Sequence, residues 1–129
     1  MSDKFTVEII SPDQTILKQE ANEVIIPSYE GQMGILKDHI PLITFLRPGL
    51  IKIKAEKEKN YFVEEGTVEF SNNNLLILTS TSKNLENFDN SLINDLIHKE
   101  EANLNNTNIS DKDRYIASYK IETLKEISQ

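Results

Sequence analysis

The segment from residue 27 to residue 42 gathers the residue types that most often form a functional site. It contains two glycines, two prolines and His39, one of two histidines in the chain. A histidine there would serve as a general base, a metal ligand or an interface residue. No cysteine, second histidine or hydroxyl nucleophile lies nearby in the sequence to complete a dyad with it. We therefore interpret His39 as hydrogen-bonding to backbone or packing at an interface, with a metal or catalytic role as the lesser alternative.

Elsewhere the sequence lacks the usual marks of an active site. Glu64 and Glu65 are adjacent carboxylates, but neighbouring residues of a strand point to opposite faces, so the two would share a site only across a bulge. The chain has no phosphate-binding glycine-rich loop, no HExxH motif and no nucleophile elbow. Because it has no cysteine, it offers neither disulfides nor thiolate metal ligands. These observations predict a protein that performs no chemistry by itself, without catalytic or metal-binding residues.

The charge balance narrows the classes of partner. The formal net charge is −7, with 14 Lys and Arg against 21 Asp and Glu. Nucleic-acid binding needs a basic surface that replaces counterions, so we expect no nucleic-acid partner. No apolar run approaches the ~18–20 residues of a membrane span, and the first residues have neither a signal-peptide nor a transit-peptide layout. We expect no direct membrane insertion, and contact with a membrane system only through another protein.

The first two thirds of the chain must position segment 27–42, and their pattern is that of short strands. Apolar residues alternate or come in brief runs from Phe5 to about Thr81, with Gly, Pro and Asn breakers between them. Many short strands at nearly regular spacing predict an antiparallel β-sandwich or flattened barrel. Gly31 and Gly34 permit backbone conformations closed to other residues, and Pro41 stiffens the exit of the segment. We interpret the segment as a recognition loop on a rigid sheet.

After about Lys83 the pattern becomes helical. Leu92, Ile93, Leu96 and Ile97 follow helical spacing, and residues 116–127 form a second apolar stripe. Asp89, Asn90 or Ser91 is expected to cap the first helix, and Ser110 begins a capping-box pattern before the second. The prediction is a two-domain chain: an antiparallel β-sandwich over residues 1–83 and an antiparallel two-helix hairpin over residues 84–129.

A family resemblance rests on the same segment. Residues 24–42 resemble the signature V-x-I-P-x-x-E-G-x-x-G-I-L-x-x-H-x-P-L of the epsilon subunits of F-type ATP synthase. The likeness continues through residues 46–51 and 61–66, and it ends at residues 74–79. It therefore covers nearly all of the amino-terminal two thirds, in order and with matching spacing. A lone E-G-x-x-G would be a weak signal, whereas this whole string is a specific one.

The resemblance implies a non-catalytic central-stalk subunit of the rotor of a proton-translocating F-type ATP synthase, which couples rotation of the c-ring to the gamma subunit. In that family the sandwich packs against the gamma subunit and sits on the c-ring. When the contact positions of the family are carried over to this sequence residue by residue, the expected c-ring contacts are Glu30, Gly31, Gln32, Met33 and Gly34. The expected gamma contacts are His39, Pro41 and Leu42. The implied location is the cytoplasmic side of the bacterial inner membrane, or alternatively the stromal face of the thylakoid.

The hairpin departs from the family pattern. Some members bind ATP there through an I/L-D-x-x-R-A motif with further arginines, whereas residues 93–98 contain no arginine. Without guanidinium groups that grip phosphate, we expect no ATP cofactor. The family also uses the hairpin to contact the alpha and beta subunits and inhibit ATP hydrolysis. Candidate inhibitory contacts are Lys112, Arg114, Lys120 and Lys125, although four nearby carboxylates leave the segment neutral.

Two other readings of the sequence stay open. One is a stand-alone β-sandwich that binds a small ligand at the loop from Glu30 to Leu42. The other is a small hydrolase or metal enzyme that uses His39 together with carboxylates.

Overall fold

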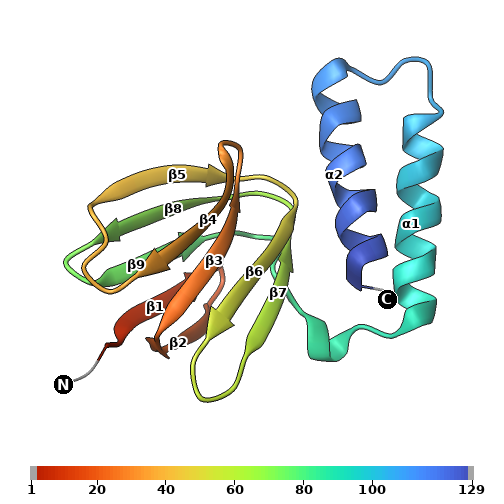
Figure 1. Cartoon of the computed structure of the whole chain (residues 1–129). Helices are drawn as coiled ribbons and strands as arrows, with labels where there is room; N and C mark the ends of the chain where they lie inside the picture. The colour runs from red at the N-terminus through yellow and green to blue at the C-terminus, as the bar shows by residue number, and fades with distance from the viewer. Residues whose placement is uncertain (1–2, 128–129) are drawn as a thin grey trace. The chain divides into compact units, whose positions relative to one another are not determined.

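The computed structural model describes residues 3–127, and of Asn87 its backbone alone. The first and last two residues of the chain, at the outer ends of the two expected domains, lie outside the described residues. The chain divides into two compact units, Met1–Leu85 and Glu86–Gln129. The first consists of strands and the second of helices (Figure 1).

Ten strands form the first unit within the described residues. They are β1 (Phe5–Ile10), β2 (Thr15–Ala21), β3 (Glu23–Ser28), β4 (Gly31–Leu36), β5 (Leu42–Leu46), β6 (Gly49–Lys54), β7 (Lys59–Val63), β8 (Gly66–Ser71), β9 (Asn74–Leu78) and β10 (Lys83–Asn84). The order across the sheet is β10-β7-β6-β3-β5-β8-β9-β1-β2, and β4 pairs with β3. All pairs are antiparallel except β1 with β9, which is parallel. Figure 1 shows these strands curling around an interior, as the predicted sandwich requires.

The sheet curls where β3 changes its partner. Residues 23–25 of β3 pair with β6, whereas Ser28 pairs with Leu46 of β5. Pro27 lies between them, and its ring nitrogen has no hydrogen to donate to a continuing ladder. The carbonyl oxygen of Pro27 instead accepts the N–H of Arg47, at 2.9 Å. Past this point the two halves of the sheet diverge, so that their apolar faces enclose one core.

The core is built from apolar residues that alternate with polar ones along the strands. Phe5, Val7 and Ile9 of β1 are buried while the residues between them are half-exposed. The ring of Phe5 packs edge-on against Phe70 of β8, with centroids 5.6 Å apart. Each large apolar side chain removed from water contributes about 1.5–3 kcal/mol before entropy is counted. The polar group Ser28 is also buried, and its hydroxyl shares a hydrogen bond of 2.9 Å with that of Thr44.

The segment expected to be a loop is largely a strand. Gly31–Leu36 forms β4, which pairs with the whole of β3 around a two-residue turn at Tyr29 and Glu30. Gly31 supplies a φ of 118° after the turn, and the Ser28 hydroxyl accepts the N–H of Glu30 at 3.1 Å. Gly31 therefore serves a tight hairpin, and Gly34, which also suggested irregular structure, lies within the strand paired with Ile25. Irregular backbone is confined to residues 37–41, between β4 and β5.

A short 3-10 helix, η1 (Leu85–Asn87), spans the boundary between the units, and the second unit then contains α1 (Asn90–Leu104) and α2 (Asp111–Ile127). Asp89 caps α1 by accepting the N–H of Leu92 at 2.7 Å, and Ser110 accepts that of Asp113 at 3.1 Å. The predicted stripe on α2 is confirmed at its centre, since Ala117, Ile121 and Leu124 are buried. On α1, Ile93, Ile97 and Glu100 are buried, and Leu92 is exposed.

Among residues 3–127, no helix is both long enough and apolar enough to cross a bilayer.

Gly66 offers a test of how tightly the β7–β8 turn is packed. A Cβ atom at Gly66 would lie 2.6 Å from the carbonyl oxygen of Leu78, so Gly66→Ala is expected to destabilise the chain by ~1–3 kcal/mol. A Cβ at Gly34 would meet only the flexible Glu23 carboxylate at 3.2 Å, so Gly34→Ala should stay within about 0.5 kcal/mol. Urea unfolding of both variants measures the difference. Equal stabilities would contradict the packing.

Candidate functional site

The turn between β3 and β4 forms a braced, exposed tip of the sheet. Tyr29 and Glu30 are exposed, and the N–H of Tyr29 donates to the carbonyl oxygen of Phe45 at 3.3 Å. The five expected c-ring contacts do not all point the same way. Gln32 and Gly34 are exposed on β4, whereas Met33 packs against the core. Glu30 and Gln32 are therefore the side chains of this set that are available to a partner.

His39 is engaged within its own loop. Its N–H donates to the carbonyl oxygen of Leu36 at 3.1 Å, and its Nδ1 lies 2.7 Å from the carbonyl oxygen of Ile40. The ring stands edge-on to Phe70, with centroids 5.9 Å apart and an interplanar angle of 88°. The arrangement agrees with the interpretation of His39 as a residue that bonds to backbone. In the part of the chain that the structure describes, no three His, Cys, Asp or Glu side chains are placed to hold a metal ion.

A shallow apolar groove begins next to this loop. It encloses about 360 Å³ and is lined by Pro41, Leu42, Ile43, Glu69, Phe70 and Ser71. Leu42 is half-buried and also packs against the core, so it presents only part of its side chain to the groove. Two of the three expected gamma contacts, Pro41 and Leu42, therefore line this groove.

The groove opens onto an exposed apolar surface that the sequence analysis missed. We call the outward side of β5, β8, β9 and β1 the outer face. Strand register aligns Phe45 with Thr67, Thr67 with Leu78, and Leu78 with Ile10, so one row crosses four strands. The next row contains Ile43, Glu69, Leu76 and Glu8. Ile43 is 76% exposed, Phe45 61% and Leu78 44%.

A signal for this face was present in the run Leu42–Leu46. Leu42 and Leu46 turn inward with Thr44, so the residues between them must turn outward. Those residues are Ile43 and Phe45, which are as apolar as the inward set. A strand that is apolar on both faces needs a cover on both.

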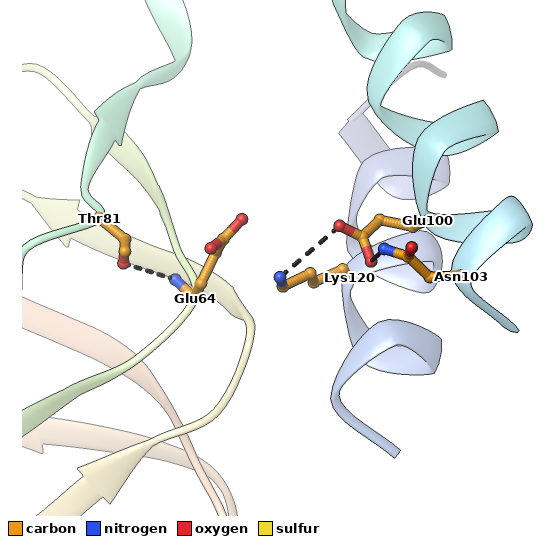
Figure 2. Close-up of polar contacts among 5 residues, drawn as sticks. All are labelled: Glu64, Thr81, Glu100, Asn103 and Lys120. Atoms are coloured by element: carbon orange, nitrogen blue, oxygen red, sulfur yellow. Dashed lines mark hydrogen bonds and ion pairs between the residues drawn. The ribbon is translucent and has the colours of Figure 1, made fainter. Parts of the chain in front are cut away.

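The adjacent carboxylates Glu64 and Glu65 lie in the turn between β7 and β8. The N–H of Glu64 donates to the hydroxyl of Thr81 at 3.0 Å (Figure 2), and the carbonyl oxygen of Glu65 accepts the hydroxyl of Thr79 at 2.6 Å. The hydroxyls of Thr79 and Thr81 are 3.1 Å apart. These threonines fasten the turn through its main chain, a structural role for the segment.

In the hairpin, two of the four candidate inhibitory residues join the helices. Lys120 Nζ lies 3.6 Å from Glu100 Oε1, and the two side chains are 19% and 12% exposed. Asn103 donates to the other Glu100 oxygen at 3.4 Å (Figure 2). Arg114 donates to the carbonyl oxygen of Leu104 at 2.9 Å and so caps the end of α1. Lys112 and Lys125 are exposed.

An outward groove of about 440 Å³ runs along α2. It is lined by Asp111, Arg114, Tyr115, Ser118, Tyr119 and Glu122. The two tyrosine rings meet edge-on with centroids 4.7 Å apart, and the hydroxyl of Tyr115 donates to that of Tyr119 at 3.1 Å. Tyr115 is 46% exposed. The groove combines amphipathic rings with both signs of charge, a composition that is common at protein interfaces.

Comparison with known proteins identifies the family. Residues 4–84 match the family described as ATP synthase, Delta/Epsilon chain, beta-sandwich domain. The chain is also 45% identical over 130 residues to the ATP synthase epsilon chain of Pelagibacter ubique (strain HTCC1062), covering 99% of this chain and 100% of the relative. This chain belongs to the epsilon-subunit family of F-type ATP synthases.

A second curated relative and a chain of a solved structure have lower sequence identity to this chain. The mitochondrial ATP synthase subunit delta of Schizosaccharomyces pombe is 36% identical over 110 residues, which cover 82% of this chain and 66% of the relative. A chain of the Euglena gracilis mitochondrial ATP synthase structure, OSCP/F1/c-ring in rotational state 1, aligns with a TM-score of 0.83 at 21% identity, over 100% of this chain and 84% of that one. At that identity the likeness shows that the fold is shared.

Loss of the Lys120 ammonium is expected to destabilise the hairpin of this epsilon-family chain. Lys120→Met keeps the apolar stem but leaves the Glu100 carboxylate mostly buried without its cation, at a cost of ~1–3 kcal/mol. Lys112→Met, on the exposed side of the same helix, should change stability by less than about 0.5 kcal/mol. Unfolding of the full chain followed by far-UV circular dichroism compares them. If both variants lose the same stability, the ion pair does not brace the hairpin.

Proposed function

We propose that this chain is a non-catalytic central-stalk subunit of a proton-translocating F-type ATP synthase, in which it links the c-ring to the gamma subunit. Family membership and the exposed apolar outer face support the proposal. The Euglena structure is titled as an OSCP/F1/c-ring assembly, and a Tetrahymena thermophila chain of TM-score 0.65 comes from a structure titled central stalk/cring. We also propose that the assembly lies on the cytoplasmic side of a bacterial inner membrane. The support is that one relative is the ATP synthase epsilon chain of Pelagibacter ubique.

The outer face is the proposed gamma-docking surface. Ile43 and Phe45 of β5 and Leu78 of β9 expose large apolar side chains on the same side of the sheet, with β8 between the two strands, and exposed apolar residues gathered in this way mark an interaction surface. The groove beside Pro41 and Leu42 continues the same surface toward the β4–β5 loop. Burying a phenylalanine or isoleucine gains about 1.5–3 kcal/mol, so two or three such residues provide the apolar centre of a stable interface.

The β3–β4 tip is the proposed c-ring contact. Its polar exposed residues, Tyr29, Glu30 and Gln32, suit the polar loops of a ring rather than its lipid-facing sides. The tip is held by the Ser28 hydroxyl and by the main chain of β5, so its position relative to the outer face is defined by hydrogen bonds. A coupling element must transmit torque without bending, and a tip braced to the same sheet as the gamma-docking surface meets that need.

The hairpin is the proposed site of regulation through the alpha and beta subunits. Lys112 and Lys125 are exposed, and the α2 groove adds Tyr115 and Arg114 to the surface on offer. Lys120 and Arg114 also join the two helices. To bind a partner with their charged groups, they must first break these internal contacts. Inhibition of ATP hydrolysis is the effect we assign to that contact.

Docking on gamma is tested by a charge placed in the outer face. Phe45→Glu is expected to raise the Kd for the gamma chain of the same synthase by at least about 30-fold, because truncating a hot-spot residue costs 2 kcal/mol or more. Lys57→Glu changes an exposed residue in the β6–β7 turn and should leave the Kd unchanged. Calorimetric titration measures both. If the wild-type chain forms no complex with gamma, the rotor role is wrong and a stand-alone binding module is favoured.

Regulation is tested by removing the hairpin from the assembled synthase. A chain that ends at Leu85 keeps β10, which pairs with β7 through Lys83 and Asn84, and is expected to assemble normally. ATP hydrolysis by that complex should rise several-fold over the complex with the full chain. A full-length control with Tyr115→Ala and Arg114→Ala should give an intermediate rise. Unchanged hydrolysis by the truncated complex would contradict the inhibitory role.

A further inference from the structure

The loop between β4 and β5 is fastened to a turn that lies far from it in the sequence. The N–H of Asp38 donates to Asn73 Oδ1 at 2.7 Å, and Asn73 Nδ2 donates to Asp38 Oδ1 at 3.0 Å. The carbonyl oxygen of Asn73 also accepts the N–H of Thr6 at 3.0 Å. One asparagine therefore ties the β8–β9 turn, the start of β1 and the β4–β5 loop together. We call the reciprocal pair the Asp38–Asn73 clamp.

The backbone at the clamp is unusual for its residue types. Asp38, Asn72 and Asn73 have φ values of 67°, 51° and 58°, and within residues 3–127 they are the non-glycine residues with positive φ. Asn72 and Asn73 form the two-residue turn of the β8–β9 hairpin, between the paired residues Ser71 and Asn74. Such a turn favours glycine at its second position. An asparagine at residue 73 is the poorer choice for the turn, but its side chain makes the clamp.

The clamp determines what the β4–β5 loop presents. With Asp38 held, the next residue, His39, turns its ring edge-on to Phe70, which also lines the groove. Its Nδ1 lies 2.7 Å from the carbonyl oxygen of Ile40. The exposed apolar side chains of the loop are Ile40, which is 74% exposed, and Pro41 at the rim of the groove. His39 is thus an internal brace, and Ile40 is the contact residue that the loop offers.

We infer that Asn73 is a positioning residue for the gamma-docking surface, which holds Ile40 and Pro41 beside the outer face before a partner arrives. The inference rests on the proposed function. An exposed loop of five residues that must be ordered on binding lowers affinity by the entropy it loses. Two hydrogen bonds made in the free protein remove part of that loss in advance. The clamp acts on binding through the loop, and Asn73 itself need not touch the partner.

Substitution by glycine separates the clamp from the turn. Asn73→Gly suits the positive φ and removes both side-chain bonds, so the chain should fold with equal or higher stability in urea. Asn72→Gly makes the same change one residue earlier, where no clamp bond is made, and is the matched control. Asp38→Asn keeps an acceptor for Asn73 Nδ2 and should behave like the wild type.

Two measurements test the inference. In Asn73→Gly, hydrogen exchange at the Asp38 amide should quicken about fivefold, as expected for a lost hydrogen bond of average strength. The Kd for the gamma chain should rise about 5- to 20-fold while stability does not fall. Asn72→Gly should change neither. If Asn73→Gly speeds exchange at Asp38 but leaves the Kd unchanged, the inference is wrong. If exchange itself is unchanged, the clamp does not hold the loop and the inference is also wrong. Both outcomes leave the rotor role intact. Failure of the wild type to bind gamma contradicts the proposed function instead.

Discussion

The architecture of the first unit depends on one main-chain constraint, the missing amide hydrogen of Pro27. Because β3 cannot carry its ladder with β6 past that residue, its last position pairs with β5 instead. The change of partner turns an open sheet into one that encloses a core. The bend also brings Gly49 close to β3, since a Cβ there would lie 2.5 Å from the Cβ of Pro27. The buried Ser28–Thr44 hydrogen bond then satisfies the polar side chains trapped at the bend.

This bend also relates the two proposed contact surfaces to each other. β3 leads directly into the Tyr29–Glu30 tip, and β5 carries Ile43 and Phe45 on the outer face. Both strands meet at the pairing of Ser28 with Leu46. A load applied to the tip therefore reaches the outer face through main-chain hydrogen bonds and not through side-chain packing alone. Hydrogen-bonded strands are stiff along their length, which suits an element that transmits rotation.

The sequence predicted the elements whose apolar residues alternate or cluster, and it missed those defined by their partners. β1, β6 and β9 have alternating or clustered apolar residues, and they belong to the pattern of short strands that the sequence shows from Phe5 to about Thr81. β2 is an edge strand with few apolar residues, β4 contains two glycines, and β10 has two residues, so their local signals are weak. The burial of Glu100 has no local signal in the sequence, because its cation lies on the other helix. Such pairings depend on the tertiary fold, which local periodicity does not encode. The family signature gave no sign that the His39 ring bonds to the main chain of its own loop or that Ile40 is exposed.

The parallel pairing of β1 with β9 has a consequence for synthesis of the chain. Residues 6–10 find one neighbour within a few positions, in β2, but the other neighbour is residues 74–78. While the chain leaves the ribosome, β1 can pair with β2 but has no partner for its other edge and no cover for its apolar side. The core is closed only when nearly the whole first unit has emerged. A pairing of such long sequence separation slows folding, and the nascent amino terminus is the part of this protein most exposed to aggregation before its last long strand arrives.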